Sequence, residues 1–383
     1  MTTVTAEVTP AHSSTRGGRL LAAARHAAPA LAGYAAIKVF GVLTIVVWGL
    51  AVDRQPAQLL AKADGGWYLR IAQHGYDMGE RLQSDMAFFP LYPGLIAALD
   101  PLTPLSPRGT ALVIGWLASL AAAWGIFAIG DHLFDRRTGV LLALVWGALP
   151  HAIVQSMAYT EGLFTAFTAW TLLALLRRQW LTAGVLCLLA GLTRPTATAL
   201  IAVVGLAALI AAVRRRDGWR PIAAMLLAPA GWAGYLAWVG WVTGRLDGWF
   251  HIQREGWNMA FDAGASTLER GSSLLFANAS ALDYYVVTLV IVLAVMLLVL
   301  CLLDRQPWQL VLFSALLLAN TVAAAGYYHA KARFLLPAFP LLLPVAVALA
   351  RTGRAKAGTI VATLVLISVY LGGYLLVIWT HSP

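Results

Sequence analysis

The chain consists of long apolar stretches separated by mostly short polar turns, a pattern typical of a membrane protein with many helices. About 20 apolar residues are enough for a helix to cross the hydrocarbon core of a bilayer. Eleven stretches are legible, of which the third is short and ends at Pro150: 27–52, 109–133, 138–150, 159–176, 179–194, 197–213, 220–242, 283–303, 308–326, 333–350 and 357–380. We therefore predict an all-α, polytopic membrane protein with about eleven transmembrane helices.

Two segments between these stretches, about 53–108 and 243–282, are much longer than the other turns. Loops of more than about 12–15 residues are usually functional or disordered, and these two contain Trp, Tyr, Phe and His rather than linker residues. Residues 88–99 are too few and too often interrupted by Pro to cross a bilayer, so we expect a re-entrant or interfacial segment there. Both long segments are predicted to be folded extracytoplasmic loops with short amphipathic helices.

The N-terminal residues 1–18 are rich in Thr, Ser, Ala and Gly and have no apolar period. Such a segment cannot bury enough surface to offset the entropy of ordering, so we predict a disordered cytoplasmic tail followed by a single transmembrane domain over 19–383. The first apolar stretch exceeds the roughly 7–15 residues of a signal-peptide core, which predicts an uncleaved helix. No internal repeat is visible in the sequence, so an inverted-repeat transporter has no support.

Composition and charge agree with a membrane location. Hydrophobic residues make up 60% of the chain and charged residues 11%, against about 25% charged residues in soluble proteins. The net charge of +10 would suit nucleic acid only on a clustered basic face, and the arginines are scattered between apolar stretches, so no nucleic-acid partner is expected. Cys187 and Cys301 lie within apolar stretches, which predicts buried thiols rather than a disulfide or metal site.

The distribution of charges predicts the orientation of the chain. With the N-terminus in the cytoplasm, the basic turns at 136–137, 177–178, 214–220, 305 and 351–356 all face the cytoplasm, as the positive-inside rule requires. Most acidic residues then lie outside. We predict a multi-pass protein of the plasma membrane whose working loops face the extracytoplasmic side.

Asp64 is the first candidate for chemistry, because it follows the first apolar stretch directly in the outer loop. Its neighbours Gly65 and Gly66 permit close approach of a ligand to the backbone. A carboxylate here can act as general base and remove a proton from a sugar hydroxyl. Asp is also a common cap of a helix, here one starting near Trp67; residue type alone favours capping, and the two roles can coexist.

Three acids follow in the same loop, Asp77, Glu80 and Asp85. Their spacing does not fit a calcium loop, so a solvated acidic face is predicted and no metal site.

His74 titrates near neutral pH and is a candidate acid, base or phosphate donor. A single His beside Gly75 more commonly makes a local hydrogen bond.

Glu161 enters an otherwise apolar helix after Tyr159, and an ionisable group at membrane depth is a functional hypothesis by default because its burial is costly. Arg194 lies at the outer end of another apolar stretch. It either pairs with Glu161 or binds a phosphate through bidentate hydrogen bonds. The two interpretations are equally supported by the residues.

Two further outer segments carry polar groups beside aromatic ones. Gln253 and Trp257 lie in the second long loop, where aromatic rings and polar side chains suit a sugar, although an interfacial aromatic belt has the same composition. His329, Lys331 and Arg333 are three potential cations on the side that the positive-inside rule disfavours. Closely set cations bind phosphate, so we expect an anionic ligand such as a lipid phosphate; snorkelling to headgroups explains one cation better than three.

The sequence resembles the PIG-V-like mannosyltransferases, bacterial relatives of the enzyme that adds the second mannose to the GPI anchor. The resemblance is carried in order by Asp64, Ile71-Ala72, His74-Gly75-Tyr76, Ala87-Phe88-Phe89-Pro90-Leu91-Tyr92-Pro93, Tyr159-Thr160-Glu161, Arg194, Gln253, Trp257, Arg333 and Pro337. These proteins belong to the GT-C superfamily, which uses polyprenyl-phosphate sugars at the extracytoplasmic leaflet and typically has an essential acid in the first outer loop. Ala63 stands where the family tends to have Trp.

The resemblance implies mannose transfer from polyprenyl-phosphate-mannose to an extracytoplasmic lipid or lipid-linked glycan, by a single inverting displacement with Asp64 as base. Together with the reasoning above, it assigns Arg194, His329, Lys331 and Arg333 to the donor phosphate, and it assigns the substrate to Trp67, His74, Tyr159, Glu161, Gln253 and Trp257. The acceptor does not carry over, because the Ala- and Arg-rich composition indicates a bacterial source and bacteria lack GPI anchors. Membrane lipids are the other expected partners, and no metal or further cofactor is expected because the donor has one phosphate.

A lipid-linked sugar transporter or flippase without transferase activity is the alternative. It requires polar residues throughout many spans, and Lys38 and Glu161 are the clear candidates within the apolar stretches. An enzyme is therefore favoured. It predicts that Asp64, Glu161, Arg194 and the 329–333 cluster converge on one outward-opening cavity.

Overall fold

The computed structural model describes residues 16–79, 83–276, 280–379 and 381–383. Within these ranges the regular secondary structure is helical, apart from an isolated β-bridge between Phe261 and Ala324. Helix α1 begins at Arg16, so residues 16–18 of the predicted N-terminal tail are helical, and residues 1–15 lie outside the described ranges. The longer helices are α1 (Arg16–Ala51), α5 (Pro107–Leu133), α9 (Thr198–Val213), α10 (Arg220–Thr243), α13 (Leu282–Leu303) and α17 (Arg354–Gly373).

Six helices of the described chain are long and apolar enough to cross a bilayer. A seventh span results if the segments Tyr328–Phe334 and Phe339–Arg351, which meet at 72°, count as one. The remaining predicted stretches form shorter helices: α6 (Arg136–Gly147), α7 (Glu161–Leu176), α8 (Trp180–Gly191), α14 (Trp308–Ala323) and α16 (Leu343–Arg351). The prediction of an all-helical, multi-pass membrane protein is confirmed, whereas eleven crossings stay a prediction.

Local sequence explains where several helices begin and end. The Ser106 hydroxyl accepts a hydrogen bond from the Gly109 N–H and Pro107 is the first residue of α5, both of which favour a helix start. The Asp135 carboxylate caps α6 in the same way, by accepting from the Thr138 N–H. Helix α10 ends at Thr243 and is followed by Gly244, whose φ of 66° suits glycine.

Helices α8 and α10 pack very closely because small residues line their contact. A Cβ built on Gly231 of α10 would lie 2.1 Å from the Leu188 carbonyl oxygen of α8. A Cβ on Gly191 of α8 would lie 2.8 Å from the Trp232 backbone nitrogen. Small residues that bring two backbones together are a common basis of helix association in membranes.

Substitution of Gly231 by Ala is therefore expected to destabilise the fold by about 1–3 kcal/mol, because the Leu188 carbonyl is a main-chain atom that cannot rotate away. Gly234→Ala is the matched control, since a Cβ at Gly234 on the same helix meets nothing within 4 Å. Thermal unfolding of both variants in one detergent measures the effect. Equal melting temperatures for the two variants would contradict this account of the α8–α10 contact.

The connection between α6 and α7 is an irregular segment inside the bundle, because every residue from His151 to Thr160 is buried. Its segment η3 (Ala152–Ser156) packs against α1, α5 and α17. Side chains of these helices satisfy its backbone: Lys38 Nζ donates to the Ala152 carbonyl at 2.9 Å and Ser119 Oγ to the Gln155 carbonyl at 2.8 Å. Irregular backbone can lie inside a membrane protein when protein groups satisfy it in this way.

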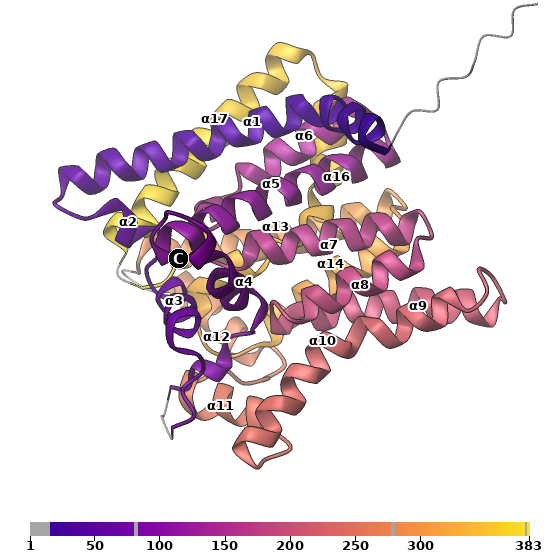
Figure 1. Cartoon of the computed structure of the whole chain (residues 1–383). Coiled ribbons are helices and arrows are strands. Elements are labelled where there is room, and N and C mark those ends of the chain that lie inside the picture. The colour runs from indigo at the N-terminus through magenta and orange to yellow at the C-terminus, as the bar shows by residue number, and fades with distance from the viewer. Residues whose placement is uncertain (1–15, 80–82, 277–279, 380) are drawn as a thin grey trace, which may run out of the picture.

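The two long loops fold together at one end of the helix bundle. Figure 1 shows their short helices on the left: α2 (Pro56–Leu59), α3 (Asp64–His74), α4 (Leu91–Leu99), α11 (Gly248–Trp257) and α12 (Ala265–Phe276). The turn from α9 to α10, which contains Arg214 to Arg216, lies on the right. The loops predicted to be extracytoplasmic and this arginine-rich turn thus lie apart, and the orientation of the bundle in a membrane stays a prediction.

Candidate functional site

Four charged side chains from distant parts of the sequence meet where the short helices join the bundle. Arg333 Nη2 lies 2.8 Å from Asp64 Oδ2, and Arg333 Nε lies 3.9 Å from Glu161 Oε1. Arg194 Nη1 lies 2.7 Å from the same Glu161 oxygen and donates a hydrogen bond to Thr160 Oγ1 at 3.0 Å. We call Asp64, Glu161, Arg194 and Arg333 the ion network. Its two acids and two arginines balance in formal charge.

Asp64 is the first residue of α3 rather than its cap, which corrects the capping interpretation. Ala63 occupies the capping position with a φ of 53°, and no side chain caps this helix. Gly65 is buried, and a Cβ built on it would lie 3.3 Å from the Ala158 carbonyl oxygen. Close packing at Gly65 therefore seats α3 against the buried connection that leads to Glu161, and this brings Asp64 to the network.

Burial differs sharply across the ion network. The Glu161 side chain is 1% exposed, whereas 24% of the Asp64 side chain is exposed, so Asp64 is the acid that an external molecule can reach. Among the described residues, Arg333 Nε and Nη1 have no hydrogen-bond acceptor. Unpaired donors of a buried guanidinium are costly. Arg333 thus retains hydrogen-bonding capacity for a ligand beside the exposed acid.

Aromatic rings support the two arginines. The Arg333 guanidinium lies 5.1 Å from the centroids of both the Tyr159 and the Phe334 rings, and Arg194 lies 5.5 Å from the Phe334 ring. Tyr159 is fully buried and donates its hydroxyl to the Lys62 carbonyl at 3.2 Å. Tyr159, predicted to bind substrate, thus lies beneath Arg333, where cation–π contact helps to fix the guanidinium.

The predicted residues of the two loops are partly brought together. Trp67 of α3 and Trp257 of α11 meet at 5.3 Å between ring centroids, and both contact Phe88. Gln253 of α11 donates to the Ala87 carbonyl at 3.3 Å. His74, in contrast, is exposed at the last residue of α3. The structure joins Trp67, Gln253 and Trp257 in one loop cluster and leaves His74 at the surface.

The acids of the first loop do not form a solvated face, so that prediction is wrong for Asp85. Asp85 is buried and its carboxylate accepts the Asp77 N–H at 3.2 Å. Burial raises the pKa of Asp85. Glu80 lies outside the described residues. In the part of the chain that the structure describes, no three His, Cys, Asp or Glu side chains are close enough to hold a metal ion.

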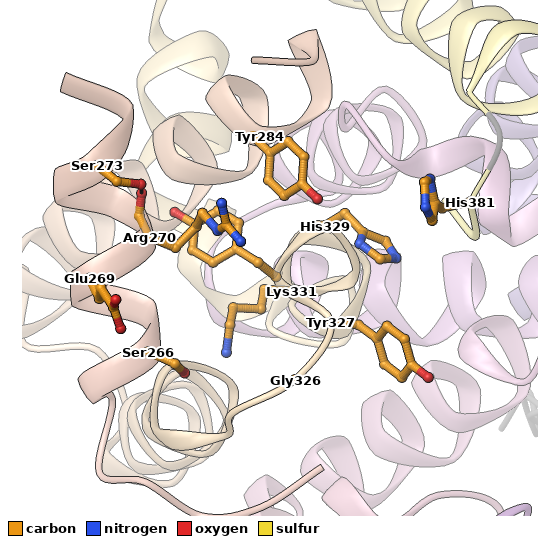
Figure 2. Close-up of a pocket in the computed structure, with 11 residues that line it drawn as sticks. Ser266, Glu269, Arg270, Ser273, Tyr284, Gly326, Tyr327, His329, Lys331 and His381 are labelled. Carbon is orange, nitrogen blue, oxygen red and sulfur yellow. Dashed lines mark hydrogen bonds between the residues drawn. The ribbon is translucent and has the colours of Figure 1, made fainter. Parts of the chain in front are cut away.

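Two cavities flank the short helix α15 (Lys331–Phe334). The first, which we call the apolar cavity, has a volume of about 570 Å³ and is walled mainly by Trp232, Trp249, Phe250, Met259, Phe261 and Phe334. Arg194, Gln253 and Arg254 also line it. The second, the polar cavity, has a volume of about 530 Å³ and is lined by Ser266, Glu269, Arg270, Ser273, Tyr284, Gly326, Tyr327, Tyr328, His329, Lys331 and His381 (Figure 2).

The cations assigned to one phosphate are divided between these cavities. Arg194 lines the apolar cavity, His329 and Lys331 line the polar cavity, and Arg333 lies between them in the ion network. Lys331 already donates to two main-chain carbonyls, Thr321 at 2.8 Å and Ala324. The sequence predicted one cavity, but consecutive residues of a short helix point to different sides of it.

Several residues of the site were missed by sequence reasoning. Glu269 and Arg270 belong to a stretch with no motif, and only the charged face of an amphipathic helix marks them. Asp283 and His151 form a buried pair, with Nε2 3.0 Å from Oδ1, behind the loops. An acid at the start of a long apolar stretch was the available signal for that pair.

Neither a family model nor a curated protein matches this sequence. Among solved structures, ArnT from Cupriavidus metallidurans bound to undecaprenyl phosphate matches with a TM-score of 0.52 at 15% identity, over 84% of this chain and 61% of that chain. ArnT in the apo state matches with a TM-score of 0.52 at 13% identity, over 84% and 60%. This chain thus spans about three fifths of the length of ArnT. At such identity the likeness shows the fold alone: the chain shares the helical fold of ArnT, and membership of the GT-C superfamily stays a prediction.

Proposed function

We propose that this chain is a membrane glycosyltransferase that takes a sugar from a polyprenyl-phosphate donor and transfers it to an acceptor hydroxyl. The fold shared with ArnT, which was solved with undecaprenyl phosphate, supports this choice of donor. The resemblance to PIG-V-like proteins supports mannose as the sugar and a lipid or lipid-linked glycan as acceptor. The same resemblance and the charge distribution support an extracytoplasmic site in the plasma membrane.

The observation that carries the proposal is the partly exposed Asp64 carboxylate held 2.8 Å from the buried Arg333. A glycosyl transfer from a lipid phosphate needs a base for the acceptor and a positive charge for the leaving phosphate. Asp64 and Arg333 supply these two groups side by side. Rigid placement on α3 and α15 favours the reaction because the reacting groups are oriented before substrate binds.

The donor fits the apolar cavity. Its aromatic walls suit a polyprenyl chain, and Arg194 at its edge, next to Glu161 and Arg333, suits the single phosphate. A bound phosphate competes with Asp64 for Arg333. In the complex, Arg333 therefore donates some of its hydrogen bonds to the phosphate. Asp64 becomes a stronger base because it loses part of its contact with this arginine.

The reaction is a single displacement with inversion. The acceptor oxygen forms a bond to the anomeric carbon while the bond from that carbon to the phosphate oxygen breaks. The acceptor proton passes to Asp64, and the electron pair leaves with the polyprenyl phosphate. Arg333 and Arg194 stabilise the charge that develops on that phosphate.

The test is transfer of label by the full chain in liposomes, with radiolabelled polyprenyl-phosphate-mannose as donor and a membrane-lipid extract as acceptor. Label is expected to move to a new lipid product. Polyprenyl-phosphate-glucose, run in parallel, tests the choice of mannose. Movement of intact donor between leaflets without any product would instead support the flippase and overturn the proposal.

A further inference from the structure

We infer that the polar cavity is the acceptor site and that it recognises the acceptor by its sugar hydroxyls rather than by its lipid. This inference rests on the proposed function, because it names the second substrate of the same site. The cavity has no role in donor binding as proposed above, and its side chains differ in kind from those of the apolar cavity.

The polar cavity lies next to the short helix that carries Arg333, the partner of the general base. Lys331 lines the polar cavity, Phe334 lines the apolar cavity, and Arg333 between them reaches Asp64. Tyr327 of the polar cavity is close enough to Asp64 for that carboxylate, in addition to burial, to raise the pKa of the phenol. An acceptor in this cavity therefore lies near Asp64 and outside the apolar cavity proposed for the donor.

The polar groups on the two sides of the cavity match a carbohydrate. Figure 2 shows Glu269, Arg270 and Ser273 of α12 on one side, and Tyr327, His329 and His381 on the other. Within the described residues, the Glu269 carboxylate forms no hydrogen bond or ion pair, and the side chain is exposed. A planar carboxylate and a planar guanidinium can each bond two neighbouring hydroxyls.

Aromatic rings complete this arrangement. The Arg270 guanidinium lies 5.5 Å from the Tyr284 ring centroid, which holds its plane against an aromatic face. Tyr284 in turn stacks on Tyr328 with 6.0 Å between ring centroids. A carboxylate, a guanidinium and aromatic rings at one opening suit a sugar ring, which has polar hydroxyls at its edge and an apolar face.

The cations of the cavity do not point to a phosphate as the main ligand. The Lys331 ammonium is bonded to main-chain carbonyls of Thr321 and Ala324. His329 Nε2 lies 3.3 Å from Ser382 Oγ. Arg270 is exposed and can contact a ligand, and the acid Glu269 next to it opposes an anion.

The test measures donor and acceptor kinetics separately in liposomes, with labelled polyprenyl-phosphate-mannose and a titrated membrane-lipid extract. Glu269→Gln and Arg270→Ala are each expected to raise the apparent KM for the extract about tenfold or more, with the donor KM unchanged. Arg254→Ala, in the apolar cavity, is expected to raise the donor KM and leave the acceptor KM unchanged. Ser272→Ala, on the exposed face of α12, is the neutral control.

Unchanged acceptor KM in both α12 variants, with transfer intact, overturns the acceptor site and leaves the proposed function standing. A second measurement covers the case in which wild type transfers nothing: saturation-transfer NMR of methyl α-mannopyranoside with the full chain in nanodiscs. Saturation transfer to the glycoside is expected with wild type and is expected to be lost in Arg270→Ala. Absence of a signal with wild type, or an equal signal with the variant, overturns the carbohydrate site whatever the enzyme's activity.

Discussion

Substitution of Asp64 by Asn is expected to lower sugar transfer by about 10²–10⁴-fold, the usual contribution of a well-placed base. The amide keeps the size of the carboxylate but cannot accept the acceptor's proton. Donor binding is expected to survive, because the donor phosphate supplies the negative charge that Arg333 loses. The measurement is initial transfer rate in liposomes together with equilibrium binding of the labelled donor.

Asp53→Asn is the matched control for this variant. Asp53 is exposed just after α1 and has a φ of 56°, a conformation that Asn tolerates, so the same chemical change there leaves transfer unaltered. Retained transfer in Asp64→Asn would remove Asp64 as base. Loss of both transfer and donor binding in that variant would make Asp64 a binding residue instead.

The helical class follows from the sequence because long apolar runs have few alternatives in a bilayer. The path of irregular segments inside the bundle cannot be predicted from the sequence in the same way. The buried connection from His151 to Thr160 depends on donors such as Lys38 and Ser119, which are more than thirty residues away in sequence. A turn and a buried irregular segment have similar composition, so the sequence pattern does not distinguish them.

The candidate site was predictable residue by residue but not as an arrangement. Asp64, Glu161 and Arg333 each stood out as a charge where charge is costly or unexpected. Their meeting depends on the packing of α3, α7 and α15, which no local pattern encodes. The sequence also does not show that Lys331 and Arg333 point in different directions, because the rotation of the helix decides where each side chain lies.

The ion network also makes a prediction about stability, because its four charges balance only as a set. Glu161→Gln removes one negative charge from a side chain that is 1% exposed and leaves Arg194 and Arg333 with Asp64 as the remaining acid. Breaking a buried pair in this way is expected to cost about 3–5 kcal/mol of folding free energy. Thermal unfolding in one detergent, read as a drop in melting temperature, measures it.

Two further variants separate burial of charge from loss of a carboxylate. Glu255→Gln makes the same chemical change in the exposed pair with Arg254, where the expected effect is about 0–1 kcal/mol. The double variant Glu161→Gln with Arg194→Gln restores charge balance, so its destabilisation should fall short of the sum of the single variants by about 0.5–3 kcal/mol. Strictly additive destabilisation would show that the 2.7 Å contact between Arg194 and Glu161 contributes no coupling energy. The ion network would then be a set of independent side chains rather than one charge-balanced site.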